Sequence, residues 1–120
     1  VFNNSTLGMV KLEMLVNGLP DFQTDVPDTN YAEIARAIGF HAERVEDASR
    51  LEAAYREAFA APGPALVEVI TDPNALSLPP AITGGQVVGF ATAMSKIVLN
   101  RGIAEAFSMA TSNMRNIPRL

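Results

Sequence analysis

Short apolar runs alternate with helical patterns over the first 70 residues, and this alternation limits the fold more than any other feature. The strand candidates are residues 1–2, residues 40–45 and the run ALVEVI at residues 65–70, which follows Pro62-Gly63-Pro64. A strand, a helix and a second strand in succession place the two strands side by side and parallel. The sequence therefore predicts an α/β fold with a parallel sheet. ALVEVI, β-branched and apolar, is typical of a central strand.

The expected helices have recognisable start and stop signals. Residues 9–16 are almost wholly apolar and predict a short buried helix, and residues 17–29 predict a loop rich in Pro, Gly and Asp. Asn30 with Glu33, and Ser49 with Glu52, both fit the capping-box spacing at a helix start. The second of these helices has an apolar stripe at helical spacing: Leu51, Ala54, Tyr55, Ala58 and Phe59.

The last third of the chain differs from the body. Residues 1–80 hold 5 Lys/Arg and 12 Asp/Glu, a net of −7, whereas residues 81–120 hold 4 and 1, a net of +3. Residues 71–85 form a Pro/Gly-rich connector, and Arg101-Gly102 separates two helices behind it. Their predicted apolar faces are Val87, Phe90, Ala91, Met94, Ile97 and Val98, then Ile103, Ala106, Phe107 and Ala110. We expect residues 1–80 to belong to one domain and residues 81–120 to be a connector with a helical tail.

Composition excludes several classes of function. The chain has no Cys and one His, so disulfides, thiolate chemistry and zinc sites built on several histidines are ruled out. A net charge of −4 argues against nucleic acid as a partner. No apolar run is long enough to cross a membrane. A cytoplasmic protein is expected, consistent with a reducing compartment.

Two adjacent asparagines at a strand end are the clearest candidate site. In VFNNSTLG, Asn3 and Asn4 follow the first strand, and Gly8, which would let the backbone pass close to an anion, precedes the first expected helix. Ligands of parallel sheets bind beyond the carboxyl ends of strands, amide oxygens suit Mg²⁺, and a helix N-terminus attracts phosphate. These residues could therefore hold a magnesium diphosphate. The alternative is a plain turn, because Asn tolerates the left-handed region and forms Asx-turns.

VFNN followed by STLGMV resembles the second half of the signature of thiamine-diphosphate enzymes. DTNYAEIARAIGF, PGPALVEVITDP and LPPAI also resemble the C-terminal domain of pyruvate oxidases and quinone-dependent pyruvate dehydrogenases. The resemblance implies the C-terminal part of a three-layer α/β/α thiamine-diphosphate-binding domain. The Gly-Asp-Gly half of the signature is absent, so we expect a fragment that is inactive on its own.

The resemblance also implies roles for individual residues. Asn4 would bind Mg²⁺ through its side-chain oxygen, and Thr6 through its backbone carbonyl. Asn3 would orient the loop. The backbone from Ser5 onward would cradle the diphosphate, with amides at Leu7, Gly8 and Met9.

Two positions bear on the branch of the family. Pyruvate oxidases resemble one another in a glutamate nine residues after the metal-binding asparagine, where acetolactate synthases have tryptophan; this chain has Glu13. A carboxylate there could handle protons, although Glu13 could also be a solvated charge on a short helix. Met9 fits the acetolactate synthases instead, since pyruvate oxidases usually have Phe there.

The resemblance implies a larger enzyme around this segment. It would use thiamine diphosphate, Mg²⁺ and FAD, remove CO₂ from pyruvate or a similar 2-oxo acid, and pass electrons through FAD to quinone or oxygen. We also expect a homo-oligomer. The tail, with Arg115 and Arg119, is a candidate for peripheral contact with the inner face of the membrane, the alternative being protein packing. The alternatives for function are an acetolactate-synthase-like carboligase and a cofactor-free α/β interaction module.

Overall fold

The computed structural model describes residues 1–76 and 81–114, which form two compact units interleaved in sequence. The sheet unit consists of residues 1–5 and 27–71. The helical unit consists of residues 6–26 together with the chain after residue 71. The predicted boundary after residue 80 adjoins a segment outside the described residues and stays a prediction.

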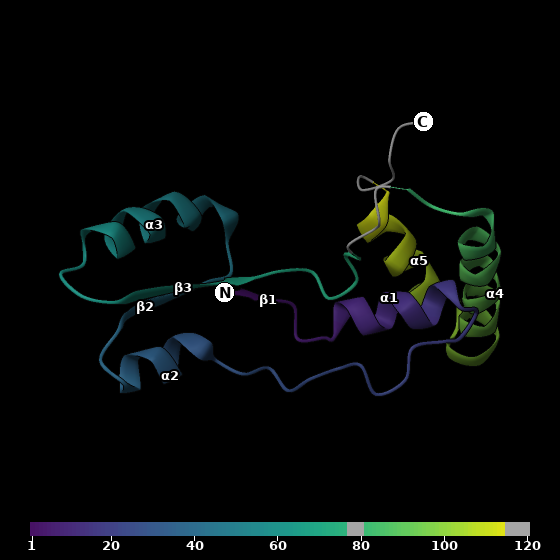
Figure 1. Ribbon diagram of the computed structural model, residues 1–120, viewed down its shortest axis with the longest axis horizontal. Helices are drawn as coiled ribbons and strands as arrows, with labels where there is room; N and C mark the ends of the chain where they lie inside the picture. The colour runs from purple at the N-terminus through teal and green to yellow at the C-terminus, as the bar shows by residue number, and fades with distance from the viewer. Residues whose placement is uncertain (77–80, 115–120) are drawn as a thin grey trace. The chain divides into compact units, whose positions relative to one another are not determined.

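The sheet unit confirms the predicted parallel α/β fold. Its strands are β1 (Phe2–Asn3), β2 (His41–Val45) and β3 (Ala65–Ile70), in the order β1-β3-β2, with all pairs parallel. Helix α3 (Leu51–Ala60) lies on one side of these strands and α2 (Tyr31–Ala37) on the other (Figure 1). ALVEVI is the central strand, as predicted, and it pairs Ile70 with Asn3 at the end of β1.

The start of α2 agrees with the sequence, but the start of α3 does not. The Asn30 side chain accepts a hydrogen bond from the Glu33 amide at 2.9 Å, and Gly39 follows the helix with a positive φ of 91°. The second predicted capping box is wrong. Asp47, rather than Ser49, supplies the cap, accepting a hydrogen bond from the Ser49 amide at 2.9 Å. This bond starts a short 3₁₀ turn, η1 (Ala48–Arg50), which leads directly into α3.

The predicted apolar stripe of α3 is only partly buried. Ala54 is fully buried, whereas the Phe59 side chain is 88% exposed. Helical spacing identifies the stripe, but the sheet contacts only its narrow centre, so Phe59 projects past the edge of the contact.

The helical unit contains α1 (Gly8–Val16), α4 (Gly84–Arg101) and α5 (Ile103–Asn113) (Figure 1). Its core consists of Leu12, Leu15, Leu76, Ala93, Ile97 and Met109. Helices α1 and α4 meet at Gly89, where an added Cβ would lie 1.8 Å from the Val16 carbonyl oxygen. No described helix combines the length and the hydropathy needed to cross a membrane.

The break at Gly102 is confirmed, but the predicted face of α5 is wrong in part. Gly102 has a φ of 95° between α4 and α5. Met109 is fully buried, while Ile103 and Phe107 are mostly exposed. The helix packs into the core through Ala106, which belongs to the predicted stripe, and through Met109, which lies one residue before the predicted Ala110. Arg115 and Arg119 lie outside the described residues.

Candidate functional site

Asn3 ends β1 and has its side chain fully engaged inside the sheet unit. Its Nδ2 donates to Glu68 Oε1 at 2.7 Å and to the Thr29 carbonyl at 3.1 Å. Its Oδ1 accepts a hydrogen bond from the Ser5 amide at 3.1 Å, which is the geometry of an Asx-turn. The turn interpretation therefore holds for Asn3, and it leaves the role of Asn4 open.

Ser5 lies in the left-handed region, with a φ of 49°. This conformation costs a non-glycine residue about 1 kcal/mol, and the bond from its amide to Asn3 helps to hold it. The chain therefore turns locally after β1, and Asn4 lies in this turn between Asn3 and Ser5.

Glu68, in the middle of β3, is the carboxylate that binds Asn3, and its side chain is 0% exposed. Its Oε2 accepts a hydrogen bond from the Ala32 amide at 3.0 Å, and Arg44 lies 3.5 Å from Oε1. Burial acts to raise the pKa of Glu68. The hydrogen bonds from Asn3 and from the Ala32 and Tyr31 amides, together with the Arg44 charge, outweigh it and lower the pKa below its ordinary value.

The sequence interpretation missed Glu68. The signal was a single charged residue with two apolar residues on each side in ALVEVI. Such a residue in a strand buried on both faces needs buried donors, so it indicates a polar site next to the strand.

In the helical unit, hydrogen bonds of Thr6 and Leu7 link the start of α1 to the loop that follows this helix. The Thr6 hydroxyl and the Leu7 amide both donate to the Thr24 carbonyl, at 3.1 and 2.8 Å. The Thr24 hydroxyl is buried and has no hydrogen-bond partner within the described residues. A buried hydroxyl without a partner is uncommon in folded proteins.

The N-terminus of α1 has the features of an anion site. The helix begins at Gly8 after Leu7, with no side-chain cap and no acidic residue in its first turn. The amides of Gly8 and Met9 have no carbonyl of a preceding turn to bond, and the helix dipole adds positive potential there. This donor set suits a diphosphate.

The two predicted metal ligands belong to different units. Asn4 is half-buried at the end of the sheet unit, and Thr6 is buried at the start of the helical unit. Among the described residues no group of three or more His, Cys, Asp or Glu could hold a metal ion. An amide and a backbone carbonyl lie outside that definition, and both are oxygen donors suited to Mg²⁺.

Glu13 is exposed on α1, and the buried charge of this helix is Lys11. The Lys11 ammonium donates to Asn74 Oδ1 at 3.2 Å and lies 3.8 Å from Asp21. Arg101 also pairs with Asp21, at 3.0 Å. Lys11 therefore stabilises the helical unit through these buried contacts. Glu13 lies on the accessible side of α1.

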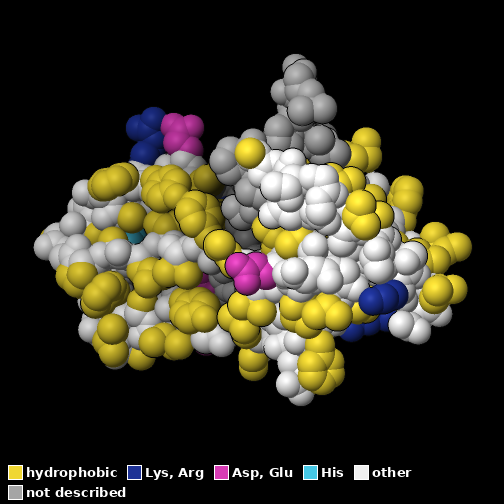
Figure 2. Space-filling model, turned by 45° about the vertical axis from the view of Figure 1, so that its right-hand side comes forward, with side chains coloured by type: hydrophobic (Ala, Val, Ile, Leu, Met, Phe, Trp, Pro, Cys, Tyr) yellow, Lys and Arg dark blue, Asp and Glu magenta, His cyan; other side chains and the backbone are white. Residues whose placement is uncertain are grey.

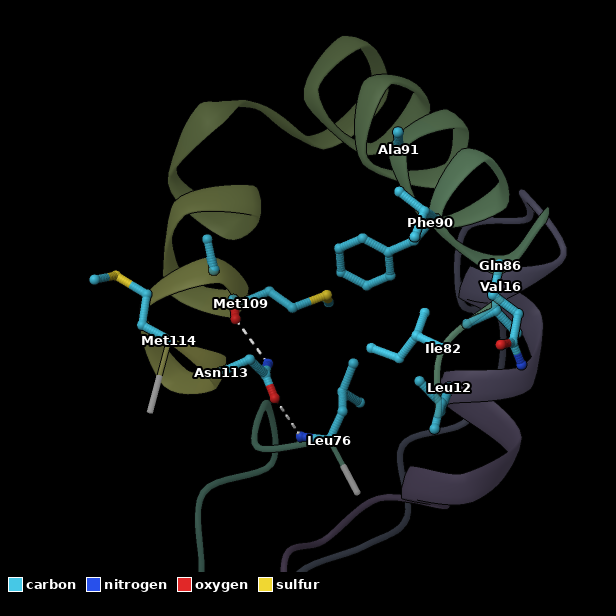
Figure 3. A pocket seen from close by; sticks show the side chains of 12 residues that line it. Leu12, Val16, Leu76, Ile82, Gln86, Phe90, Ala91, Met109, Asn113 and Met114 are labelled. Atoms are coloured by element: carbon cyan, nitrogen blue, oxygen red, sulfur yellow. Dashed lines mark hydrogen bonds between the residues drawn. The ribbon is translucent and has the colours of Figure 1, made fainter. Parts of the chain in front are cut away.

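The helical unit also contains an apolar pocket of about 510 Å³ that is partly open to solvent (Figure 3). Leu12, Phe90 and Met109 point into it from α1, α4 and α5. At one end Asn113 accepts a hydrogen bond from the Leu76 amide and donates to the Met109 carbonyl. None of the described residues that line this pocket is titratable, so the pocket differs in kind from the polar site after β1.

A parallel sheet whose first strand ends in an asparagine turn, followed by a helix without a side-chain cap, is the general arrangement of α/β domains that bind phosphate-bearing ligands. Residues 1–69 match the family model described as the C-terminal TPP-binding domain of thiamine pyrophosphate enzymes. The chain therefore belongs to this family.

Individual relatives agree with this family at different coverage. A Bacillus subtilis protein named "Putative thiamine pyrophosphate-containing protein YdaP" is 35% identical over 96 residues, which are 80% of this chain and 17% of that protein. The acetolactate synthase large subunit IlvG of Mycobacterium tuberculosis is 46% identical over 48 residues, 40% of this chain and 9% of that subunit. The chain thus spans less than a fifth of the curated relatives that it matches.

Proposed function

We propose that residues 3–9 hold the magnesium diphosphate of thiamine diphosphate within a larger enzyme. The uncapped N-terminus of α1, directly after the asparagine pair, is the observation that carries this proposal. Thr24, whose carbonyl binds the Leu7 amide, also has a buried hydroxyl with no partner among the described residues. The residues present therefore fit the cofactor.

Each predicted residue has a part in this proposal. Asn4 and the Thr6 carbonyl are the Mg²⁺ ligands supplied by this segment. The diphosphate would accept hydrogen bonds from the amides of Leu7, Gly8 and Met9. The Leu7 amide already donates to the Thr24 carbonyl, so it would divide its hydrogen bond between that carbonyl and the diphosphate. Asn3 and Ser5 shape the turn.

We further propose oxidative decarboxylation of pyruvate or a similar 2-oxo acid as the reaction, with FAD held elsewhere in the protein and quinone or oxygen as acceptor. Thiamine diphosphate would supply the carbon nucleophile that makes loss of CO₂ possible. Glu13, exposed on α1, is the residue of this segment proposed to move a proton near the substrate.

An acetolactate-synthase-like carboligase is the second candidate. Met9 and the 48-residue match to IlvG favour it, while Glu13 favours the oxidase branch. Membership of the thiamine pyrophosphate family favours both over a cofactor-free interaction module. Visible absorption of the full-length protein separates the two enzymes. A flavin that pyruvate reduces supports the oxidase. Absence of such reduction by pyruvate supports the carboligase.

The cellular setting is part of the same proposal. We propose a cytoplasmic homo-oligomer. Exposed apolar side chains are widespread on the face in Figure 2, and Phe2, Phe59 and Leu99 are among the most exposed large ones. Such surface is typical of subunit contact. Packing against a neighbouring subunit remains our preferred role for the tail over membrane contact.

The metal site is tested by Asn4→Ala in the full-length protein, with Asn30→Ala as control. Asn30 caps α2, so its loss should cost about 1 kcal/mol of stability without touching the cofactor. Calorimetric titration of thiamine diphosphate at fixed Mg²⁺ should show much weaker binding for Asn4→Ala alone. Equal affinity in the two variants would remove Asn4 from the metal site.

A further inference from the structure

We infer that Glu68 is a positioning residue for the cofactor site, acting through Asn3 on the turn that carries Asn4. Glu68 is buried in the central strand, and its carboxylate is bonded to Asn3 at 2.7 Å. The inference rests on the proposed function, in which Asn4 binds Mg²⁺. Every contact that carries it lies within the sheet unit.

Glu68 determines which way round the Asn3 amide lies. Both Nδ2 hydrogens are used, by Glu68 and by the Thr29 carbonyl, and Oδ1 faces the Ser5 amide. Rotating the amide by half a turn would set its oxygen against the carboxylate and its NH₂ against the Ser5 N–H. A buried carboxylate makes that alternative costly, because like partners would face each other without solvent.

The orientation of Asn3 in turn supports the left-handed conformation of Ser5. The Ser5 amide is bonded to Asn3 Oδ1 at 3.1 Å, and Ser5 has a φ of 49°. Without that bond a non-glycine residue has less reason to stay there. Asn4 sits between the two bonded residues, so its backbone is set by the same turn.

The Glu68 carboxylate is itself held from the other side. Its Oε2 accepts a hydrogen bond from the Ala32 amide at 3.0 Å, and Arg44 lies 3.5 Å from Oε1. Arg44 is also bonded to Asp28 and Glu46. Since both oxygens have partners, the carboxylate cannot turn away from Asn3 without losing a buried hydrogen bond.

The test compares Glu68→Gln with Asn30→Ala in the full-length protein. Glutamine keeps the shape but offers one acceptor where two donors converge, so it cannot satisfy both Asn3 and Ala32. Titration of Mg²⁺ at fixed thiamine diphosphate should show an apparent dissociation constant raised about tenfold to a hundredfold for Glu68→Gln. Asn30→Ala loosens the same helix start and should leave this constant unchanged.

A double variant checks the route through Asn3. If Glu68 acts through Asn3, then Asn3→Ala and the Asn3→Ala/Glu68→Gln pair should bind Mg²⁺ equally. Additive losses would overturn the inference. Asn3→Ala also keeps the test valid if Glu68→Gln folds poorly, because it removes the Asn3 side chain that is hydrogen-bonded to both Glu68 and Ser5.

Hydrogen exchange provides a readout that needs no cofactor. The peptide containing Ser5 should exchange faster in Glu68→Gln than in Asn30→Ala, measured by mass spectrometry. Unchanged exchange overturns the inference while Mg²⁺-dependent binding by the unmodified protein still upholds the proposed function. Faster exchange in a protein that binds no thiamine diphosphate would instead overturn the proposed function, and with it the role of Glu68 at a cofactor site.

Discussion

At the scale of single residues, one buried carboxylate organises the polar side of the sheet unit. Glu68 bonds the end of β1 through Asn3 and the start of α2 through Ala32. Burying a charge is costly unless it is well paired, and Glu68 has hydrogen-bond donors on both oxygens. Breaking this arrangement should therefore cost stability in a way that depends on pH.

Acid should destabilise the protein partly through Glu68. Its pKa in the folded chain is lowered below the ordinary 4.5. The stability that it contributes is therefore present above about pH 4.5 and is lost as pH falls through the lower folded value. Chemical denaturation at a series of pH values should show a shallower acid loss for Glu68→Gln than for the unmodified chain.

Glu57→Gln is the matched control for this pH dependence. Glu57 is exposed and makes no hydrogen bond or ion pair within the described part of the chain. The free energy of unfolding of Glu57→Gln should fall with decreasing pH as it does in the unmodified protein. An equally steep fall in Glu68→Gln would contradict the role assigned to Glu68.

At the scale of elements, close helix contact and the choice of buried face decide how the helical unit packs. Helix α4 approaches α1 at a glycine, because no side chain fits between Gly89 and the Val16 carbonyl. Helix α5 buries Met109 and leaves Phe107 exposed. Each of these features makes a prediction that sequence periodicity alone would not.

Gly89→Ala should destabilise the protein by about 3 kcal/mol, at the upper end of the usual cost of overpacking. The added Cβ would lie 1.8 Å from a backbone oxygen, so the helices would have to separate. Gly85→Ala, in the same helix, meets nothing within 4 Å and should be neutral or slightly stabilising. Thermal melting compares the two, and equal melting temperatures would contradict the predicted contact.

Met109→Ala should cost about 2–5 kcal/mol, because it opens space in the core. Phe107→Ala removes a side chain that is 67% exposed in this chain and should cost far less.

Vesicle flotation and a melting curve on Phe107→Ala of the full-length protein distinguish the proposals for the tail. Lower stability with unchanged flotation supports subunit packing, and reduced flotation supports lipid contact.

At the scale of the whole molecule, the magnesium site that we propose is incomplete in this segment. Mg²⁺ requires near-octahedral oxygen coordination, and the proposal takes only one amide and one carbonyl from these residues. The sequence has no Gly-Asp-Gly motif that could add a carboxylate.

Residues 1–120 alone should therefore bind thiamine diphosphate weakly and decarboxylate no 2-oxo acid. Isothermal titration with thiamine diphosphate and Mg²⁺ measures the binding, and release of CO₂ from pyruvate measures the reaction. Tight, Mg²⁺-dependent binding by this segment would show that the missing carboxylate is not needed.

The sequence by itself determined the parallel α/β class, the central position of ALVEVI, the cap at Asn30 and the stop at Gly102. These depend on local propensity and on the spacing of apolar residues, which the chain carries without reference to its fold. Only the tertiary structure decided that Glu68 meets Asn3 across 65 residues and that Asp47, not Ser49, caps the turn that leads into α3. It also decided which face of α5 is buried. Such features depend on which groups a neighbouring element presents, and burial then selects the pairing that leaves the fewest polar groups without partners.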